Sequence, residues 1–354
     1  MKKNVHTAGK SRKQKKIMLL LLELLIILLL AIALFITTKL SKIEKNRLDM
    51  NDVSINDDLS DETKEAMAHY KTIALFGLDN RSNGSLSKGN SDVIMLANID
   101  TKQHTINLVS VYRDSYLDTG NGTYQKCNAA YAKGGPEQAL SMLNTNLDLA
   151  ITDYVTVDFN AIIECVDLLG GVDITITDDE ASLMIGYMKE LNELTGHNST
   201  PPASGGTYTL NGVQATAFAR IGDDYRRTER QRTVLTAMMQ KAQKSNILTL
   251  NKLINAAFGD IQTSFSNTDL LALATKVFSY DIGDTTGFPY EKTTHKYDKI
   301  GDVVIPCDLA SNVTQLHQFL FNDENYTPSA TVLSNSQQII SNTDAYQAQL
   351  INRD

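Results

Sequence analysis

The sequence predicts an α/β fold, an α-β-α sandwich with a central mixed sheet, preceded by one transmembrane helix. From residue 71 onward, short apolar runs of strand length alternate with amphipathic helical stretches, a pattern typical of a sheet covered by helices. The 354 residues are 42% hydrophobic, which suits one sizeable globular domain with extra segments. An N-terminal apolar segment has the length needed to cross a bilayer.

That segment is residues 17–38, which contain fifteen Leu or Ile and a single charge, Glu23. A helix rises about 1.5 Å per residue, so this stretch crosses a hydrocarbon core of roughly 30 Å. It exceeds the apolar region of a cleaved signal peptide, and no small-residue cleavage site follows it. We therefore expect a retained signal-anchor in the cell membrane. The seven Lys or Arg before it, unaccompanied by any acid, predict a cytoplasmic N-terminus and an extracellular body.

These features divide the chain into five expected parts. Residues 1–16 form a cytoplasmic basic tail, 17–38 the signal-anchor, 39–70 a polar juxtamembrane stalk, 71–325 the globular domain and 326–354 a polar C-terminal tail.

Charge and cysteine content exclude several classes of function. The chain carries a net charge of -8 despite its basic N-terminus, and so acidic a body argues against nucleic-acid binding. Cys127, Cys165 and Cys307 are scattered and odd in number, so they indicate buried free thiols, with no metal spacing and no disulfide framework. HExxH, GxSxG and Walker motifs are absent from the sequence, which gives no support to the corresponding chemistries.

Hydrophobic patterning places the individual elements. The expected strand at 105–111 forms a hairpin with the expected strand at 93–99. A strand pair is expected within residues 285–306. We expect strands at 72–77, 93–99, 105–111, 154–157 and 172–176, and helices at 137–146, 159–169, 211–219, 228–244, 247–258, 269–280 and 311–321.

Charged residues cluster at the ends of the first three strands. Asp79 and Arg81 follow the first, Asp92 precedes the second, and Arg113 and Asp114 follow the third. Loops at strand ends are where a rigid sheet presents its chemistry. Asp is also an ordinary turn residue, so a structural role explains each acid taken alone better than a functional one.

The most arginine-rich stretch spans residues 219–232, with five arginines within thirteen positions. Arginine suits two-pronged recognition of phosphate because its guanidinium is always charged and presents a fixed fork of donors. Arg227, Arg230 and Gln231 are spaced i, i+3 and i+4, so they are predicted to share one helix face near its positive N-terminal end. Such an end favours anions. A solvated, salt-bridged helix face is the alternative for this segment alone.

Taken together, the motifs resemble those of the LytR-CpsA-Psr family over residues 70–290. The resemblance rests on their order along the chain: Gly77-x-Asp79-x-Arg81, Ser91-Asp92, Arg113-Asp114, Asn128-x-x-Tyr131-x-x-Gly134-Gly135, Leu210-Asn-Gly-x-x-Ala215, Ala219-Arg220 and Asp224-x-x-Arg227-x-x-Arg230-Gln231. It implies a phosphotransferase on the outer face of the membrane. Such an enzyme moves a glycopolymer (teichoic acid, capsule or similar) from an undecaprenyl-pyrophosphate carrier to peptidoglycan, assisted by Mg²⁺.

The resemblance also implies roles for individual residues. Asp79 and Asp92 are expected to coordinate Mg²⁺, and Asp114 or Asp224 could serve as the base. A lipid pocket is expected between the sheet and its covering helices. The arginines Arg81, Arg113, Arg220 and Arg227 are expected to clamp the phosphates, with Asp224, Arg230 and Gln231 completing the site.

One departure concerns position 222, which is Gly where the family commonly has a second arginine. Either Arg226 substitutes for it or the clamp has one arginine fewer. The second case leaves open a different function, that of a non-catalytic, membrane-tethered binder of polyprenyl phosphate or wall polymer. A role as a transcription regulator is disfavoured by the expected topology and the acidic charge.

Overall fold

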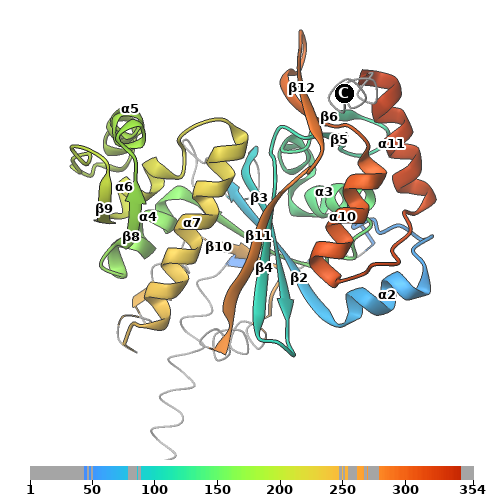
Figure 1. The fold of residues 1–354 in the computed structure, drawn as a ribbon, viewed down its shortest axis with the longest axis horizontal. Helices are drawn as coiled ribbons and strands as arrows, with labels where there is room; N and C mark the ends of the chain where they lie inside the picture. The colour runs from blue at the N-terminus through green and yellow to red at the C-terminus, as the bar shows by residue number, and fades with distance from the viewer. Residues whose placement is uncertain are drawn as a thin grey trace, which may run out of the picture. The chain divides into compact units, whose positions relative to one another are not determined.

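A central sheet of seven strands organises the molecule, in the order β1-β10-β7-β2-β3-β4-β11 (Figure 1). The structure, a computed structural model, describes residues 44–45, 48, 51–78, 86, 89–246, 249, 252–253, 261–266, 269 and 279–343. The strands are β1 (Glu44–Lys45), β2 (Tyr70–Leu78), β3 (Ser91–Asp100), β4 (Thr105–Val111), β7 (Asp153–Asp158), β10 (Ile261–Thr263) and β11 (Asp281–Phe288).

The sheet is mixed, as predicted. Strand β2 runs antiparallel to β3, and β3 runs antiparallel to β4, which confirms the expected hairpin. Strand β7 is parallel to β2, and β11 is parallel to β4. The short strand β10 was not predicted, because its three residues lack a periodic pattern.

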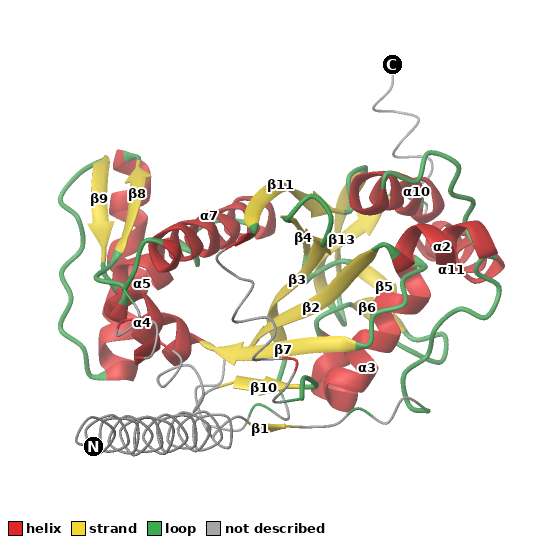
Figure 2. Ribbon diagram, turned by 90° about the horizontal axis from the view of Figure 1, so that it is seen from below, coloured by secondary structure: helices red, strands yellow, loops and turns green. Residues whose placement is uncertain are grey.

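Helices cover both faces of this sheet, which gives the predicted α/β layering (Figures 1 and 2). One face carries α2 (Asp61–Ala68), α3 (Ala129–Leu147), α10 (Leu309–Phe321) and α11 (Ala330–Thr343), and the other carries α4 (Phe159–Leu168), α6 (Gly212–Phe218) and α7 (Asp224–Gln243).

The alternation of side chains along the strands assigns residues to the two faces. On β2, Phe76 and Leu78 belong to the main core with α3 and α10. The alternate residue Leu75 packs with Leu235 of α7 on the opposite face. Because both faces are covered, the strand reads as a nearly continuous apolar run.

A smaller lobe lies beyond α4 and α7, on the side away from the sheet (Figure 2). It contains a two-stranded antiparallel sheet of β8 (Val172–Ile176) and β9 (Gly206–Leu210), and helix α5 (Asp178–Thr195), which lies between these strands in the chain. No helix was expected here, although Thr177 and Glu180 form a capping box at the start of α5. That pair is the signal for a helix N-terminus that was available in the sequence.

Beyond β11, strands β12 (Lys292–Tyr297) and β13 (Gly301–Pro306) form the strand pair expected in this region. Strands β5 (Tyr116–Asp118) and β6 (Tyr124–Lys126) form another short hairpin.

The C-terminal region corrects one expectation. A polar, loosely ordered tail was expected from about residue 326, but helix α11 forms there and buries Val332 and Ile339. Polar side chains take part in its packing, because Asn335 accepts a hydrogen bond from the Tyr124 hydroxyl at 2.8 Å. Paired polar groups can enter a core, so composition alone underestimated this segment.

The structure leaves the membrane prediction untested. Among the described residues, no helix is long and apolar enough to cross a bilayer. The predicted signal-anchor at 17–38 lies outside them, as do most of the helices expected at 247–258 and 269–280.

The buried carboxylate of Asp148 ties two distant segments to the end of α3. It ends α3 in the left-handed conformation, with φ 53°. It accepts hydrogen bonds from the Asn56 amide, the Tyr326 hydroxyl and, at 2.8 Å, the backbone N–H of Ser329. The segment before β2 and the loop before α11 are therefore held to the end of α3.

We predict that Asp148→Ala lowers the free energy of unfolding by about 3 kcal/mol, since it leaves several buried donors without an acceptor. Urea unfolding of the purified protein measures the change. Asp100→Asn, in an exposed turn where Asp100 accepts only from local backbone N–H groups, is the control and should change stability by less than about 1 kcal/mol. A variant of Asp148 as stable as wild type would contradict this role.

Candidate functional site

Two arginines from distant parts of the chain meet at one carboxylate, that of Asp92, the second residue of strand β3. Arg113 lies just beyond β4, and its Nη1 donates to Oδ1 of Asp92 at 2.7 Å. Arg227 lies in the first turn of α7, and its Nη2 donates to Oδ2 at 3.1 Å. We call these three residues the Asp92 centre.

The Asp92 centre is largely shielded from solvent. Arg227 is only 9% exposed. Its Nε is buried and has no hydrogen-bond partner among the described residues. Burial by itself raises the pKa of Asp92, but Arg227 and Arg113 outweigh that effect and hold the pKa below its ordinary value. The carboxylate is therefore ionised at neutral pH.

Positive charge exceeds negative charge here. Asp114 lies 3.9 Å from Nε of Arg113 and 3.0 Å from Nζ of Lys126. Two carboxylates are thus surrounded by three cations, and the N-terminus of α7 adds its positive end. Such a surplus suits an anion. Lys126 was not among the predicted site residues.

A tight turn before α7 sets the position of Arg227. Gly222 adopts φ +91°, and a side chain there would lie 3.0 Å from Nη1 of Arg230. Asp223 then caps the helix by accepting from the backbone N–H of Arg226 at 3.0 Å. Position 222 is therefore unfavourable for an arginine, which gives a physical reason for the departure noted in the sequence.

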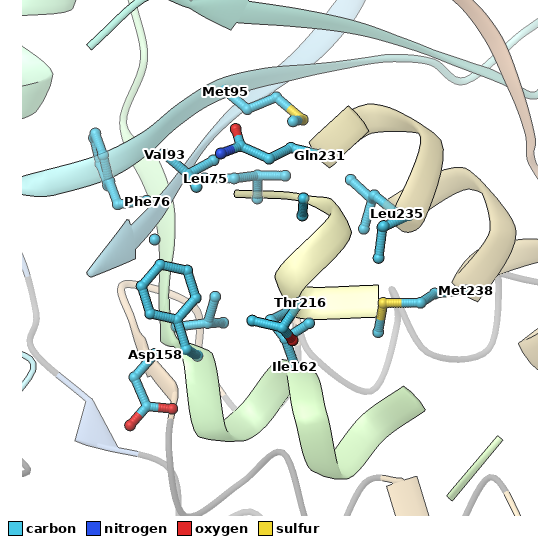
Figure 3. A pocket seen from close by; sticks show the side chains of 15 residues that line it. Leu75, Phe76, Val93, Met95, Asp158, Ile162, Thr216, Gln231, Leu235 and Met238 are labelled. Carbon is cyan, nitrogen blue, oxygen red and sulfur yellow. The ribbon is translucent and has the colours of Figure 1, made fainter. Parts of the chain in front are cut away.

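A narrow apolar groove of about 130 Å³ adjoins the Asp92 centre, between the sheet and helices α4, α6 and α7 (Figure 3). Val93 of the groove follows Asp92, and Gln231 lies one turn beyond Arg227. Figure 3 shows Gln231 extending from α7 towards Val93, while the oxygens of Asp158 point away from the groove. The wall consists mainly of apolar side chains, among them Leu75, Val93, Met95, Phe159, Ile162, Val234, Leu235 and Met238.

The groove matches the expected pocket between the sheet and its covering helices. On α7, Gln231, Leu235 and Met238 lie at i, i+4 and i+7, so the helical period turns all of them towards the sheet. That spacing could have indicated the groove-facing side of α7. The contributions of Phe159 and Ile162 from α4 could not be read from spacing.

Two of the predicted arginines contact carboxylates other than Asp92. Arg220 is buried beside the rings of Phe159 and Tyr187, at 5.6 and 5.5 Å from their centroids, and its Nη2 lies 3.4 Å from Oε2 of Glu190. Phe159 also lines the groove, and the predicted role of Arg220 as a phosphate clamp stays a prediction.

Arg230 holds the smaller lobe to α7. Its Nε donates to Oε1 of Glu180, and its Nη1 donates to the carbonyl oxygen of Ile221, each at 2.8 Å. Its predicted role in substrate binding stays a prediction. Arg226 is exposed and stays a candidate for the missing arginine.

The remaining predicted residues lie outside what the structure describes. Asp79 and Arg81 belong to the segment after β2 that is not described, and neither is the side chain of Asp224. Among the described residues, no three His, Cys, Asp or Glu side chains cluster as metal ligands would. Of the predicted pair of Mg²⁺ carboxylates, the structure describes Asp92, whose two oxygens accept from Arg113 and Arg227, and its role as a metal ligand stays a prediction.

Fold and site together define an α/β sandwich that joins an arginine–carboxylate centre to an apolar groove. The LytR_cpsA_psr family matches residues 32–298, and the chain belongs to this family.

Comparison with curated proteins gives relatives with a stated activity. The polyisoprenyl-teichoic acid–peptidoglycan teichoic acid transferase TagU of Enterococcus faecalis is 28% identical over 210 residues, which cover 57% of this chain and 64% of the relative. The chain spans about half to two thirds of the length of the curated relatives it matches.

Solved structures share the fold. A Streptococcus agalactiae protein superimposes with a TM-score of 0.61 at 25% identity, over 77% of this chain and 94% of that one. The protein YwtF (TagT) with bound octaprenyl pyrophosphate lipid gives a TM-score of 0.54 at 21% identity, over 78% of this chain and 99% of that one.

We predict that Asp92→Asn lowers the free energy of unfolding by roughly 2 kcal/mol at pH 7, because two guanidinium groups lose their carboxylate. The pKa of Asp92 is lowered on folding. The ionised carboxylate therefore stabilises the fold fully above the ordinary pKa of 3.8. This stabilisation is lost as the pH falls through the lower pKa of the folded state. The difference between wild type and variant should be constant from about pH 5 to 7 and narrow below about pH 3.8.

Urea unfolding across this pH range makes the measurement. A difference that is unchanged at pH 3 would contradict the assignment of the stabilisation to the ionised carboxylate.

Proposed function

We propose that this protein is a phosphotransferase that moves a phosphoglycopolymer, such as teichoic acid or capsule, from an undecaprenyl-pyrophosphate carrier to peptidoglycan. The observation that carries this proposal is the position of the Asp92 centre beside an apolar groove, whose lining includes Val93, the residue after Asp92, and Gln231, one helical turn after Arg227. A polyprenyl pyrophosphate has the matching parts, a diphosphate head and an apolar chain. The named activity of the Enterococcus relative and the lipid bound to TagT support the same substrate class.

The reaction needs little covalent chemistry from the protein. An acceptor hydroxyl attacks the phosphorus that carries the glycopolymer. The bond between this phosphorus and the carrier phosphate breaks, and the carrier phosphate leaves as an anion. Phosphoryl transfer depends on positioning and on cations that neutralise charge on the phosphate oxygens. Arg113 and Arg227 supply such cations, and the groove walls hold the lipid chain in place.

The acceptor proton requires a base. Asp114 and Asp224 are the candidates, and Asp114 has the position for it, between Arg113 and Lys126. After transfer the proton resides on this carboxylate and passes to solvent.

We propose that Mg²⁺ assists, held by Asp92 together with Asp79. Mg²⁺ prefers one or two carboxylates plus phosphate oxygens of the substrate, and it would neutralise charge on the diphosphate. We also propose that residues 17–38 anchor the protein in the cell membrane with the N-terminus in the cytoplasm, so that the domain works on the outer face.

A second function, binding without catalysis, is favoured by the arginine arrangement. Gly222 occupies the place of an arginine, and Arg220 is engaged by Glu190. A protein of this kind would hold polyprenyl phosphate or wall polymer at the membrane.

Turnover of a lipid-linked pyrophosphate donor separates the two functions. We predict that Arg113→Ala and Arg227→Ala each lower kcat/KM by roughly a hundredfold or more, because each removes a cation from the developing charge. Chelation of Mg²⁺ should stop turnover, and its addition should restore it. Lys102→Ala, in an exposed turn, is the control. Binding without turnover in the wild-type protein would favour the second function.

We further predict that Thr216→Phe, which fills the groove, raises KM for a long-chain polyprenyl donor by roughly tenfold, while a donor with a short chain is affected less. Thr216 is buried in the groove wall, and overpacking there costs about 1–3 kcal/mol, so a thermal melt accompanies the kinetics. Thr233→Phe on the exposed side of α7 is the matched control. Equal effects on both donors would argue against the groove as the lipid site.

A further inference from the structure

Four side chains form a second cationic site on the side of the Asp92 centre away from the groove. Tyr112 and Tyr225 meet edge to face with ring centroids 4.8 Å apart. Nζ of Lys292 lies 5.2 Å from the Tyr112 centroid and 4.8 Å from the Tyr225 centroid. Arg232 interacts electrostatically with Tyr112. We call Tyr112, Tyr225, Arg232 and Lys292 the tyrosine–cation cluster.

No carboxylate of the described residues lies within ion-pair distance of either cation in this cluster, although Glu229 attracts Arg232 from further away. Neither Lys292 nor Arg232 forms an ion pair with any carboxylate of the described residues. Nε and Nη1 of Arg232 are buried and make no hydrogen bond within that part of the chain. Lys292 donates to the backbone carbonyl of Tyr290 at 3.2 Å.

Holding these cations in place has an energetic cost. Burial lowers the pKa of Lys292, and it lowers the pKa of Arg232 by more than Tyr112 and Glu229 offset. Buried donors and charges without partners destabilise a fold. A ligand that brings negative charge would remove this cost and gain several charge-assisted hydrogen bonds.

The cluster is rigidly joined to the Asp92 centre by the backbone. Tyr112 directly precedes Arg113, and the backbone N–H of Tyr112 donates to Phe288 at the end of β11, at 2.9 Å. On α7, Tyr225 and Arg232 lie at i and i+7, whereas Arg227 and Gln231 lie at i and i+4 on a different side of the helix. Along the strand ends of the sheet, the groove lies over β7, β2 and β3, the Asp92 centre joins β3 to the end of β4, and Tyr112 of the cluster joins the end of β4 to β11. The Asp92 centre therefore lies between the groove and the cluster.

This order has a consequence for a bound donor. If the lipid chain occupies the groove and the diphosphate occupies the Asp92 centre, the glycopolymer extends away from the groove, towards the cluster. We propose that Lys292 and Arg232 form a second anion subsite, which binds a phosphate group carried by the glycopolymer itself. The proposal rests on the proposed function and narrows its substrate class to polymers that carry phosphate, as opposed to uncharged polysaccharides.

The test uses two donors on the same polyprenyl pyrophosphate. One carries an uncharged disaccharide, and the other carries that disaccharide with one glycerol phosphate attached. For each form of the full-length protein, the ratio of kcat/KM for the two donors is measured, and the ratio of their equilibrium binding constants is measured alongside it.

We predict that wild type prefers the phosphate-bearing donor and that Lys292→Ala and Arg232→Gln each reduce this preference by roughly tenfold, the loss of about one charge-assisted contact. Arg232→Lys should retain part of the preference because it keeps the charge. Lys296→Ala, exposed on the same strand β12, should keep the wild-type ratio.

Two results would overturn the subsite. One is an equal kcat/KM for the two donors in wild type, and the other is an unchanged ratio of kcat/KM in both charge-removing variants. Absence of turnover with either donor would contradict the proposed function instead. In that case the ratio of the equilibrium binding constants for the two donors is sufficient to test the subsite.

Discussion

The balance of charge around Asp92 is the interaction on which the rest of the structure depends. One carboxylate at the start of β3 holds Arg113 from the end of β4 and Arg227 from the start of α7. Each arginine is long and would otherwise be mobile, and side-chain entropy opposes its ordering. Fixing both guanidinium groups at one point leaves them preorganised for an anion, with surplus positive charge that the protein itself does not neutralise. The contact of Arg227 with Asp92 also holds the start of α7 against the sheet, and α7 forms one wall of the groove.

The groove exists because the sheet has two different faces. On one face, residues such as Phe76 and Leu78 are fully buried against α3. On the other, Leu75, Val93 and Met95 meet α7 less completely and leave an apolar space. A strand assigns alternate residues to opposite faces, so a few consecutive residues of β2 and β3 contribute both to the core and to the candidate lipid site. The anion centre lies at the end of these same strands, which explains how a charged and an apolar site come to adjoin.

The arginines near the start of α7 divide into separate roles, although they are close in sequence. Arg227 turns towards Asp92, whereas Arg230 turns towards Glu180 and the carbonyl of Ile221. Arg232 interacts electrostatically with Tyr112, whose ring Lys292 of strand β12 also faces. Three positions of one helix thus serve the anion centre, the attachment of the smaller lobe and the tyrosine–cation cluster. Spacing of i and i+3 places residues near one another, but the neighbouring elements decide which of them shares a contact.

The sequence by itself determined the class of fold, the hairpin of β3 and β4, the presence of helices α4, α6 and α7, and the set of strand ends that carry charge. These follow from local patterns, namely apolar periodicity, capping residues and turn residues, which act over a few positions. The tertiary structure decided which charges meet: that Asp92 takes Arg113 and Arg227, that Arg220 pairs with Glu190, and that Lys292 joins Tyr112 and Tyr225. It also decided that the polar residues of α11 pack against the core. Contacts of this kind join segments separated by many residues, and their partners are set by how the layers pack, which no local pattern encodes.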